Sequence, residues 1–155
     1  LFKLLENFLI EKIDDLIKQK IKCKFIGDLK RLPPTLKKLI KISEKKTSQN
    51  SIIQVNIALN YGSKSELINA LKLINKKKIK INEMNIDNNL FTKNTPNPDI
   101  MIRTGNTKRL SNFLLWQLAY TEIFFEKKLW PDFKNKDFIT ILKKYKLIKR
   151  NFGCI

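Results

Sequence analysis

Apolar positions along the chain follow two alternating periods. Spacings of three and four residues indicate amphipathic helices, whereas short β-branched or aromatic runs indicate strands. The pattern predicts helices at 1–19, from Pro33-Pro34 to about 48, at 64–76, within 79–90, at 111–119 and at 135–149. It predicts strands at 21–26, 52–59, 100–103 and 122–125, and a turn at Trp130-Pro131-Asp132.

The order of these elements predicts an α/β fold. Strands that alternate with helices form a parallel sheet flanked by helices. The run IIQVNIAL at 52–59 is apolar and β-branched, which is typical of a buried strand. Ser63 and Glu66 resemble a capping box for the helix that follows. With 155 residues, the chain suits a single domain with its own core.

Polar residues and glycines follow three of the predicted strands. They are Gly27-Asp28, Asn60-Tyr61-Gly62 and Arg103-Thr104-Gly105. Ligands of parallel α/β sheets bind beyond the carboxyl ends of the strands. We therefore expect these three segments, Asn60 included, to face one ligand-binding crevice.

The formal net charge of +18 has two explanations. A polyanionic partner, such as nucleic acid or an anionic membrane surface, would select for it. An AT-rich genome would also produce it, because Lys, Ile and Asn have A/T-rich codons and supply 66 of the 155 residues. The lysines are spread along the chain, which favours codon bias and a charge that is a general surface property.

Several kinds of chemistry are excluded by composition. The chain has no His, and its two cysteines, Cys23 and Cys154, form no CxxC motif. Zinc sites of the Cys/His type and His-dependent nucleophiles are therefore excluded. Two unpaired cysteines fit a reducing cytoplasm, and no apolar run reaches the roughly 18 residues of a membrane-spanning helix. Phosphate chemistry would depend on carboxylates, Arg, Lys, Ser, backbone amides or a hard metal ion.

Two of the four arginines lie close together in the stretch RTGNTKRLSN. Arg103 and Arg109 flank Gly105, and Ser111 with Asn112 is expected to begin a helix. A guanidinium binds phosphate or carboxylate through two donors at once, and a helix start favours an anion. From the residues alone, a diphosphate cradle and an ordinary charged surface loop both stay open.

Glu122 begins the last predicted strand, eleven residues after Ser111. An acid there can help to hold Mg²⁺ against a diphosphate, or it can be an ordinary exposed strand-end carboxylate. The neighbouring aromatic residues are expected in the core or at a subunit interface. They are Trp116, Tyr120, Phe124, Phe125 and Trp130.

Three segments resemble the cis-prenyltransferase family, and they occur in the family's order. IRTGNTKRLSNFLLWQLAYTEIFFEKKLWPDF is similar to the family's long C-terminal signature. KCKFIGDLKRLP and VNIALNYGSKSELINA are similar to two earlier segments. The resemblance runs from about residue 1 to residue 153 and is strongest to the bacterial undecaprenyl diphosphate synthases.

The resemblance implies a reaction and an architecture. The family joins isopentenyl diphosphate to an allylic diphosphate such as farnesyl diphosphate, needs Mg²⁺, and in bacteria makes the lipid carrier for cell-wall synthesis. It forms homodimers of an α/β fold with an apolar tunnel for the growing chain. Peripheral membrane contact during product release is a further expectation, and no nucleic-acid partner is expected.

Matching positions carry the implied roles of individual residues. The residues expected to contact substrate are Arg103, Arg109, Ser111, Leu1, Leu4, Leu5, Asn60 and Arg150. The three leucines match a tunnel-lining helix, and Arg150 matches a C-terminal basic position that completes the phosphate site, across the dimer. Glu122 matches the acid associated with Mg²⁺, and 113–125 matches the dimer-forming region.

The chain also departs from the family pattern. Its 155 residues contain neither the Asp-Gly-Asn-Gly-Arg loop, whose Asp is the main Mg²⁺-linked catalytic residue, nor the Ser-x-Glu-Asn-Trp segment. Ser63-Lys64 stands where Gly-Arg is usual, and Asn106-Thr107 where Gly-Glu is usual. No residue of this chain is therefore assigned as catalytic.

These departures lead to three expectations. The first is a single domain at 1–155 whose fold is incomplete at the N-terminus, a fragment of an active synthase that is inactive in isolation. The second is an inactive remnant, and the third is a non-catalytic partner subunit of the same family. A basic nucleic-acid-binding domain is a remote alternative, which would explain the charge but not the ordered motifs.

Overall fold

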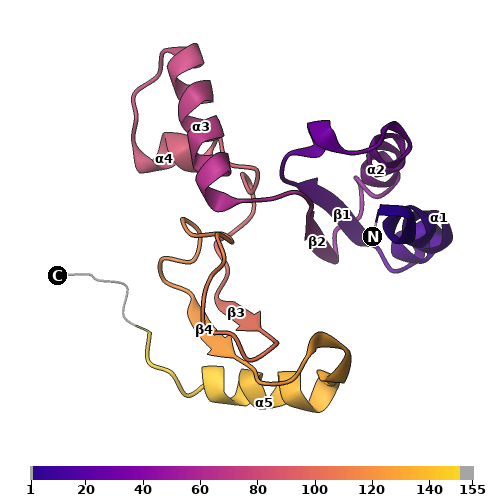
Figure 1. Cartoon of the computed structure of the whole chain (residues 1–155), viewed down its shortest axis with the longest axis vertical. Helices are drawn as coiled ribbons and strands as arrows, with labels where there is room; N and C mark the ends of the chain where they lie inside the picture. Colours follow the sequence, from indigo (N-terminus) through magenta and orange to yellow (C-terminus); the bar gives the residue numbers. More distant parts are fainter. Residues whose placement is uncertain (1, 151–155) are drawn as a thin grey trace. The chain divides into compact units, whose positions relative to one another are not determined.

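The computed structural model describes residues 2–150 (Figure 1). Its elements are α1 (Phe2–Lys18), β1 (Ile21–Ile26), η1 (Leu29–Arg31), α2 (Pro34–Lys46), β2 (Ile53–Ala58), α3 (Ser63–Lys77), α4 (Glu83–Asp87), β3 (Ile100–Arg103), β4 (Glu122–Phe125), η2 (Trp130–Asp132) and α5 (Asn135–Tyr145). The chain divides into two compact units, Leu1–Lys93 and Asn94–Ile155. Each unit is described by itself.

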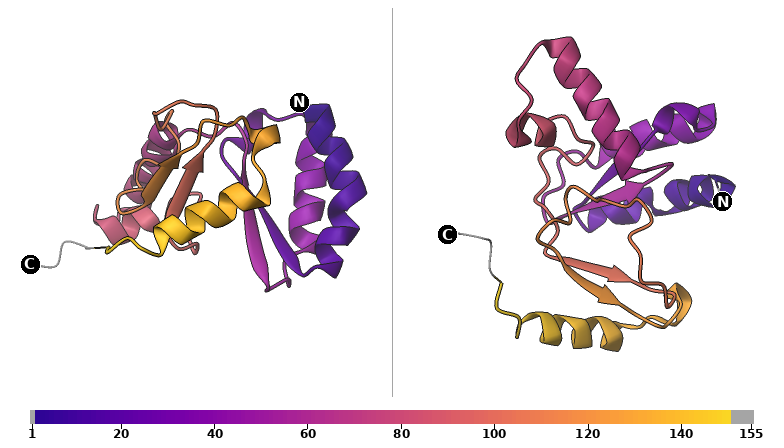
Figure 2. Two further views of the ribbon diagram at one scale, coloured as in Figure 1. Left: turned by 90° about the horizontal axis from the view of Figure 1, so that it is seen from below. Right: turned by 60° about the vertical axis from the view of Figure 1, so that its left-hand side comes forward.

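The first unit is built on β1 and β2, which pair in parallel from Ile21 opposite Ile53 to Ile26 opposite Ala58. Helices α1 and α2 lie side by side on one side of this pair (Figures 1 and 2). The residues buried between them are Leu9, Cys23, Phe25, Leu32, Leu36 and Ile40. Burying a side chain of this size contributes about 1.5–3 kcal/mol, so this cluster is the main stabilising core of the unit.

Alternation along β1 explains how that core forms. Cys23 and Phe25 face inward, while Lys22 and Lys24 between and beside them are only half-buried. Burial of Cys23 raises the pKa of its thiol, and the nearby carboxylate of Glu44 raises it further. The predicted strand at 21–26 is confirmed with its bounds.

Glu44 of α2 and Thr47, which caps the C-terminus of α2, bind backbone groups of β1 that do not pair with β2. Thr47 is fully buried, and its Oγ1 accepts a hydrogen bond from the Cys23 N–H at 3.1 Å and donates one to the Ser43 carbonyl at 2.8 Å. Glu44 Oε1 accepts from the Phe25 N–H at 2.9 Å. Because a buried N–H without an acceptor is costly, these contacts satisfy the outer edge of β1.

The expectation that 52–59 forms a buried strand is wrong. Ile53 is 54% exposed and Val55 is 39% exposed. Among the residues described, β2 pairs only with β1, and α1 and α2 cover one side of the pair. The apolar composition of β2 therefore predicted the strand but not its surroundings.

The predicted capping box at the start of α3 is also wrong. The N-cap is Gly62, so Ser63 is already the first helical residue. Glu66 is 1% exposed and uses its carboxylate elsewhere, accepting from the Phe91 N–H at 2.7 Å and the Tyr61 hydroxyl at 2.5 Å. This carboxylate ties α3 to segments on both sides of it in the sequence.

The second unit contains β3 and β4, which pair in parallel from Ile100 opposite Glu122 to Arg103 opposite Phe125. The chain then passes through η2 into α5, which ends at Tyr145, earlier than the predicted 149 (Figure 2). Asp137 near the start of α5 accepts a 2.7 Å hydrogen bond from the Lys128 ammonium and one from the Lys134 N–H at 2.9 Å. These bonds attach α5 to the segment that follows β4.

The predicted helix at 111–119 is absent from the structure, which has turns there. Ser111, Asn112 and Leu114 have φ values of +48°, +61° and +45°, which a right-handed helix cannot contain. The polar residues of this stretch, Ser111, Asn112 and Gln117, would fall on different sides of a helix, so no single apolar face specified one. The anion-attracting helix start expected at Ser111 is lost with it.

The aromatic residues expected in the core are not buried. Trp130 is 74% exposed and Tyr120 is 60% exposed, while Trp116 and Phe124 are half-buried. Trp130 stacks on Phe133 with ring centroids 6.2 Å apart. A role in a subunit interface stays a prediction for this group.

The α/β class with parallel strands is confirmed. The described strands form two separate two-stranded sheets, one in each unit, instead of one continuous sheet. That residues 1–155 form one domain stays a prediction.

Replacing Thr47 with Val tests the capped edge of β1. Valine keeps the shape of the side chain but leaves the Cys23 N–H without its acceptor, so the free energy of unfolding should fall by about 1–3 kcal/mol. Urea denaturation of this chain measures the change. The exposed Ser48→Ala is the control and should change stability by less than about 0.5 kcal/mol; equal effects of the two variants would contradict the capping role.

The Lys128–Asp137 pair should make stability depend on pH. The hydrogen bond from Lys128, followed by that from the Lys134 N–H, lowers the pKa of Asp137. Its contribution is therefore complete above the unfolded-state pKa of about 4 and is lost as the pH falls through the lower pKa of the folded state. The urea midpoints of wild type and Asp137→Asn should converge in that acid range. Asp14→Asn, which removes an exposed carboxylate, should show no such convergence.

Candidate functional site

Three of the predicted substrate-binding residues meet at the carboxyl end of β3. The Arg103 guanidinium donates through Nη1 to the backbone carbonyl of Arg109 and to Ser111 Oγ, the latter at 3.0 Å. Gly105 turns the chain with a φ of +91°, and its N–H binds the Lys128 carbonyl at 2.8 Å. The Gly105 bond thus fixes the loop after β3 to the segment after β4. The loop also folds back on itself, so that Arg103 at its start contacts Arg109 and Ser111 further along it.

This loop is electropositive. Residues 100–121 contain no Asp or Glu. Neither Arg103 nor Arg109 forms an ion pair with any carboxylate of residues 2–150, and Arg109 is exposed. Two guanidiniums that no carboxylate of residues 2–150 neutralises, with the Ser111 hydroxyl bound to one of them, can bind a phosphate-bearing ligand through charge-assisted hydrogen bonds.

The other two predicted residues of this unit lie at the opposite end of the strand pair. Glu122 begins β4 opposite Ile100, and its N–H binds the Asp99 carbonyl at 3.1 Å. Since strands rise about 3.3 Å per residue, Glu122 lies about 10 Å from Arg103 along the pair. The structure therefore does not bring Glu122 to the arginines within one chain.

Arg150 also lies at this amino end of the strands. Its Nη1 contacts Asp99 Oδ1 at 2.5 Å and the Tyr145 hydroxyl at 2.9 Å, and its Nη2 donates to the Tyr120 carbonyl at 3.0 Å. The hydrogen bond to Asp99 raises the pKa of Arg150, so its charge is permanent. Arg150 and Asp99 line a cavity of about 290 Å³ together with Gln117 and Tyr120.

A magnesium ion would find only part of its ligand set in the described chain. Among residues 2–150, no three His, Cys, Asp or Glu side chains gather as ligands for a metal ion. Mg²⁺ bound to a diphosphate needs only one or two protein carboxylates, since phosphate oxygens and water fill the other positions. The half-buried Glu122 fits such a supporting ligand, but not an independent metal site.

The predicted residue Asn60 lies in the first unit, where the carboxyl ends of β1 and β2 meet. Asn60 Nδ2 donates to the Asp28 carbonyl and the Asp28 N–H donates to the Asn60 carbonyl, both at 3.2 Å. Gly27 is required here, because a Cβ on it would lie 2.0 Å from the Leu59 carbonyl oxygen. A cavity of about 620 Å³ opens beside Gly27 and Asp28, toward Ser65 and Asn69 of α3.

Two of the three segments, at Gly27-Asp28 and at Asn60, are therefore hydrogen-bonded to each other, and of these two Gly27-Asp28 lines the cavity. That they face one ligand-binding crevice stays a prediction. The third, at Arg103, belongs to the second unit. Its meeting with Asn60 in one site stays a prediction.

The leucines assigned to a tunnel have different positions. Leu5 packs against the core of the first unit, while Leu4 is 71% exposed. Leu1 lies outside the described residues. Contact of any of them with a prenyl chain stays a prediction.

The sequence analysis did not identify two acidic residues that hold the predicted site residues and their neighbours in place. Asp99 anchors Arg150, and Glu66 holds Tyr61 in the segment after β2. Asp99 directly precedes the predicted strand at 100–103. This position at the start of a strand was the feature from which its contact with another charged residue could have been predicted. Glu66 gave a signal that was misinterpreted, because its spacing from Ser63 also suits a helix cap.

Within residues 2–150, the structure contains no helix that is both long and apolar enough to cross a membrane.

Parallel strands with a positively charged loop beyond β3 define an α/β protein that can bind phosphate groups. A family model described as "Putative undecaprenyl diphosphate synthase" matches residues 1–153. The chain belongs to this family of prenyltransferases.

Relatives of the same kind are similar in sequence to this chain over nearly its whole length. The isoprenyl transferase of Prochlorococcus marinus subsp. pastoris is 44% identical over 162 residues, covering 100% of this chain and 60% of the relative. The isoprenyl transferase of Campylobacter jejuni is 39% identical, covering 99% of this chain and 68% of the relative. The chain thus spans about three fifths to two thirds of the length of these relatives.

Solved structures of related proteins share the fold. A probable undecaprenyl diphosphate synthase from Campylobacter jejuni has a TM-score of 0.90 and 39% identity, covering 99% of this chain and 73% of that structure. Lavandulyl diphosphate synthase from Lavandula x intermedia, in complex with dimethylallyl diphosphate, has a TM-score of 0.92 and 34% identity, covering 99% and 70%.

Glu66 should be essential for the stability of the segments around Asn60. Glu66→Ala removes the acceptor of the Phe91 N–H and of the Tyr61 hydroxyl, and the unpaired N–H alone should cost about 1–3 kcal/mol of the free energy of unfolding. Urea denaturation measures it, with the exposed Glu11→Ala as control. In a double-mutant cycle, Tyr61→Phe should be less than additive with Glu66→Ala. Full additivity would mean that the Tyr61 contact contributes nothing.

Proposed function

We propose that this chain binds isopentenyl diphosphate and contributes it to cis-prenyl transfer onto an allylic diphosphate such as farnesyl diphosphate. The observation that supports the proposal is the contact of Arg103 with Ser111 and the Arg109 backbone, in a loop without acids, in a chain of the prenyltransferase family. The product would be a long-chain cis-polyprenyl diphosphate, the lipid carrier for cell-wall synthesis.

The residues of the loop would hold and orient the diphosphate. Arg103 is pre-positioned by its bond to Ser111, and the exposed Arg109 pairs with no carboxylate of residues 2–150. Their fixed positive charges would neutralise the diphosphate, leaving the apolar end of isopentenyl diphosphate directed toward the reacting partner. Asn60 would contact substrate from the end of β2, as the family resemblance implies.

Magnesium would neutralise the diphosphate that leaves from the allylic substrate. Glu122 would support such an ion. Because Glu122 and Arg150 lie at the other end of β3 and β4 from Arg103, we propose that they complete the site of a second copy. A homodimer formed through 113–125 would allow this, and that segment carries the exposed Phe113, Leu115 and Tyr120.

The chain would work in the cytoplasm, as its two unpaired cysteines suggest. By itself it would not complete the reaction, because its sequence lacks the Asp-Gly-Asn-Gly-Arg loop that carries the family's main catalytic acid. A non-catalytic partner subunit is the second candidate function. The Arg103–Ser111 contact, kept in a chain whose sequence lacks that loop, is the observation that supports it.

Arg103→Lys should weaken binding of isopentenyl diphosphate by about tenfold, because lysine keeps the charge but loses the planar fork of donors. Calorimetric titration of this chain with isopentenyl diphosphate and Mg²⁺ measures the dissociation constant. Arg31→Lys is the matched control, since Arg31 is 83% exposed and pairs with Asp28 at the surface. Unchanged binding in Arg103→Lys would remove Arg103 from the site.

A product assay separates the two candidate functions. The chain is incubated with labelled isopentenyl diphosphate, farnesyl diphosphate and Mg²⁺, and no polyprenyl product is expected. If an added catalytic family member gains activity from the chain, the partner-subunit function is supported. Product from the chain alone would contradict both its expected inactivity and the need for the missing loop.

A further inference from the structure

Arg150 follows the end of α5 by five residues and belongs to no helix or strand. Its side chain is nevertheless held, because three segments of the second unit supply acceptors for it. They are Asp99 before β3, the Tyr120 carbonyl before β4 and the Tyr145 hydroxyl at the end of α5. The Arg150 side chain is 19% exposed as a result. Side-chain contacts therefore determine where this guanidinium points.

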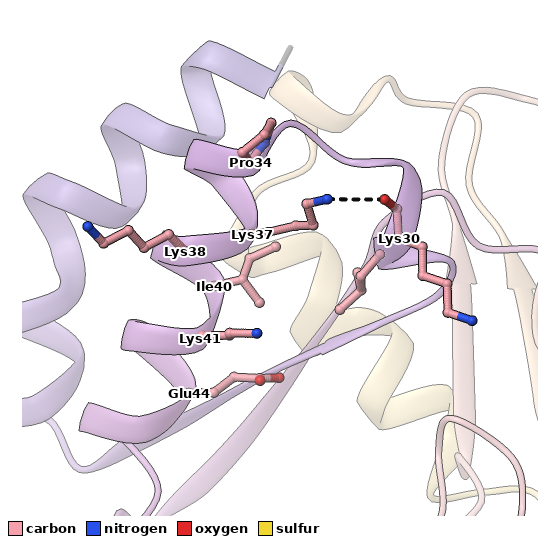
Figure 3. Close-up of a pocket in the computed structure, with 8 residues that line it drawn as sticks. Lys30, Pro34, Lys37, Lys38, Ile40, Lys41 and Glu44 are labelled. Carbon is pink, nitrogen blue, oxygen red and sulfur yellow. Dashed lines mark hydrogen bonds between the residues drawn. The ribbon is translucent and has the colours of Figure 1, made fainter.

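Several lysines of the first unit lack such an arrangement. They line a cavity of about 610 Å³ between α2 and η1 (Figure 3). The ammoniums of Lys30 and Lys38 are directed away from this cavity, and that of Lys37 donates to the Lys30 carbonyl at 3.3 Å. Charges that diverge in this way have no common ligand. Basic composition alone therefore does not mark a site in this chain, whereas a guanidinium held by several acceptors requires an explanation.

Asp99 holds Arg150 with its side chain and Glu122 with its backbone. The Asp99 carboxylate contacts Arg150 Nη1 at 2.5 Å, and the Asp99 carbonyl accepts the Glu122 N–H at 3.1 Å. Next to this backbone bond, Thr121 Oγ1 donates to the Pro98 carbonyl at 2.6 Å. Two adjacent bonds thus fix the place of Asp99 relative to Glu122. One residue links the two charged groups at this end of β3 and β4.

We propose that Asp99 is a positioning residue that directs Arg150 toward the same diphosphate that Glu122 supports through Mg²⁺. The proposal rests on the function proposed above and adds to it a residue for which the family resemblance implied no role. An arginine that its ligand must order loses rotamer freedom on binding, which lowers the affinity. Asp99 removes this loss because it orders Arg150 before the ligand arrives.

A carboxylate beside an anion site could instead compete with the anion for the arginine. The Asp99 side chain is 67% exposed, so water screens its repulsion of a diphosphate. A guanidinium has five N–H donors, and the bond from Nη1 to Asp99 directs its plane without using all of them. Both features favour orientation over competition, and the two roles have opposite effects on affinity.

Asp99→Asn keeps the backbone carbonyl that holds Glu122 but loses the negative charge that holds Arg150. In calorimetric titration of the whole chain with isopentenyl diphosphate and Mg²⁺, it should weaken binding by about fivefold, the cost of ordering one long side chain. Asp99→Glu, which keeps the carboxylate, should restore most of this loss. The matched control is Asp15→Asn, which removes an exposed carboxylate that pairs with Lys12 on α1. Tighter binding by Asp99→Asn, or equal losses in Asp99→Asn and Asp15→Asn, would overturn the proposal.

A double-mutant cycle separates positioning from an effect on the fold. Once Arg150→Gln has removed the guanidinium, adding Asp99→Asn should weaken binding no further. A loss in this background as large as that in the wild-type background would show that Asp99 acts on the fold and not through Arg150, which contradicts the proposal.

Chemical modification tests the contact without a ligand. Phenylglyoxal reacts with accessible guanidiniums, and mass spectrometry of the digested chain gives the rate at Arg150 relative to the exposed Arg109. This ratio should be low in wild type and should rise several-fold in Asp99→Asn but not in Asp99→Glu. An unchanged ratio would refute positioning by Asp99. If the ratio rises but wild type binds no isopentenyl diphosphate, the proposed function fails, while Asp99 stands as the residue that positions Arg150.

Discussion

The parallel register of β3 and β4 determines which predicted site residues can meet. Arg103 pairs with Phe125 at one end, and Glu122 pairs with Ile100 at the other. The backbone ladder fixes this offset of three residues, so Glu122 and Arg103 begin about 10 Å apart along the strand pair. Arg150 is held at the Glu122 end by Asp99. The strand pair thus carries two separate sets of charged groups, and this separation is what makes a second copy a useful element of the proposed site.

The sequence predicted elements well where one face of an element is clearly apolar. β1 alternates inward Cys23 and Phe25 with lysines, and its bounds were predicted to the residue. In α2, Leu36 and Ile40 lie one turn apart, and both are buried. The cluster of Arg103, Arg109 and Ser111 was likewise visible as a scarce residue type around a glycine, and the structure brings these three together.

Prediction failed where apolar residues point in every direction or where a residue has two suitable partners. Residues 111–119 have the composition of a helix but no polar side to orient it, and left-handed φ values at Ser111 and Leu114 break it in the structure. Glu66 has the right spacing for a cap, but buried donors from Tyr61 and Phe91 outcompete that local role. Such contacts depend on tertiary neighbours that periodicity does not encode.

The two strands of the first unit differ in how their edges are protected. The outer edge of β1 is satisfied by Glu44 of α2 and by Thr47, the residue that caps α2, and this helix packs on the same strand. Ile53 and Val55 of β2 are exposed, in a run whose composition suits a strand covered on both faces. An exposed β-branched strand is a template for pairing with another chain. Within the first unit, the outer edge of β1 is therefore satisfied by side chains of the same unit, whereas the apolar side chains of β2 find no cover there.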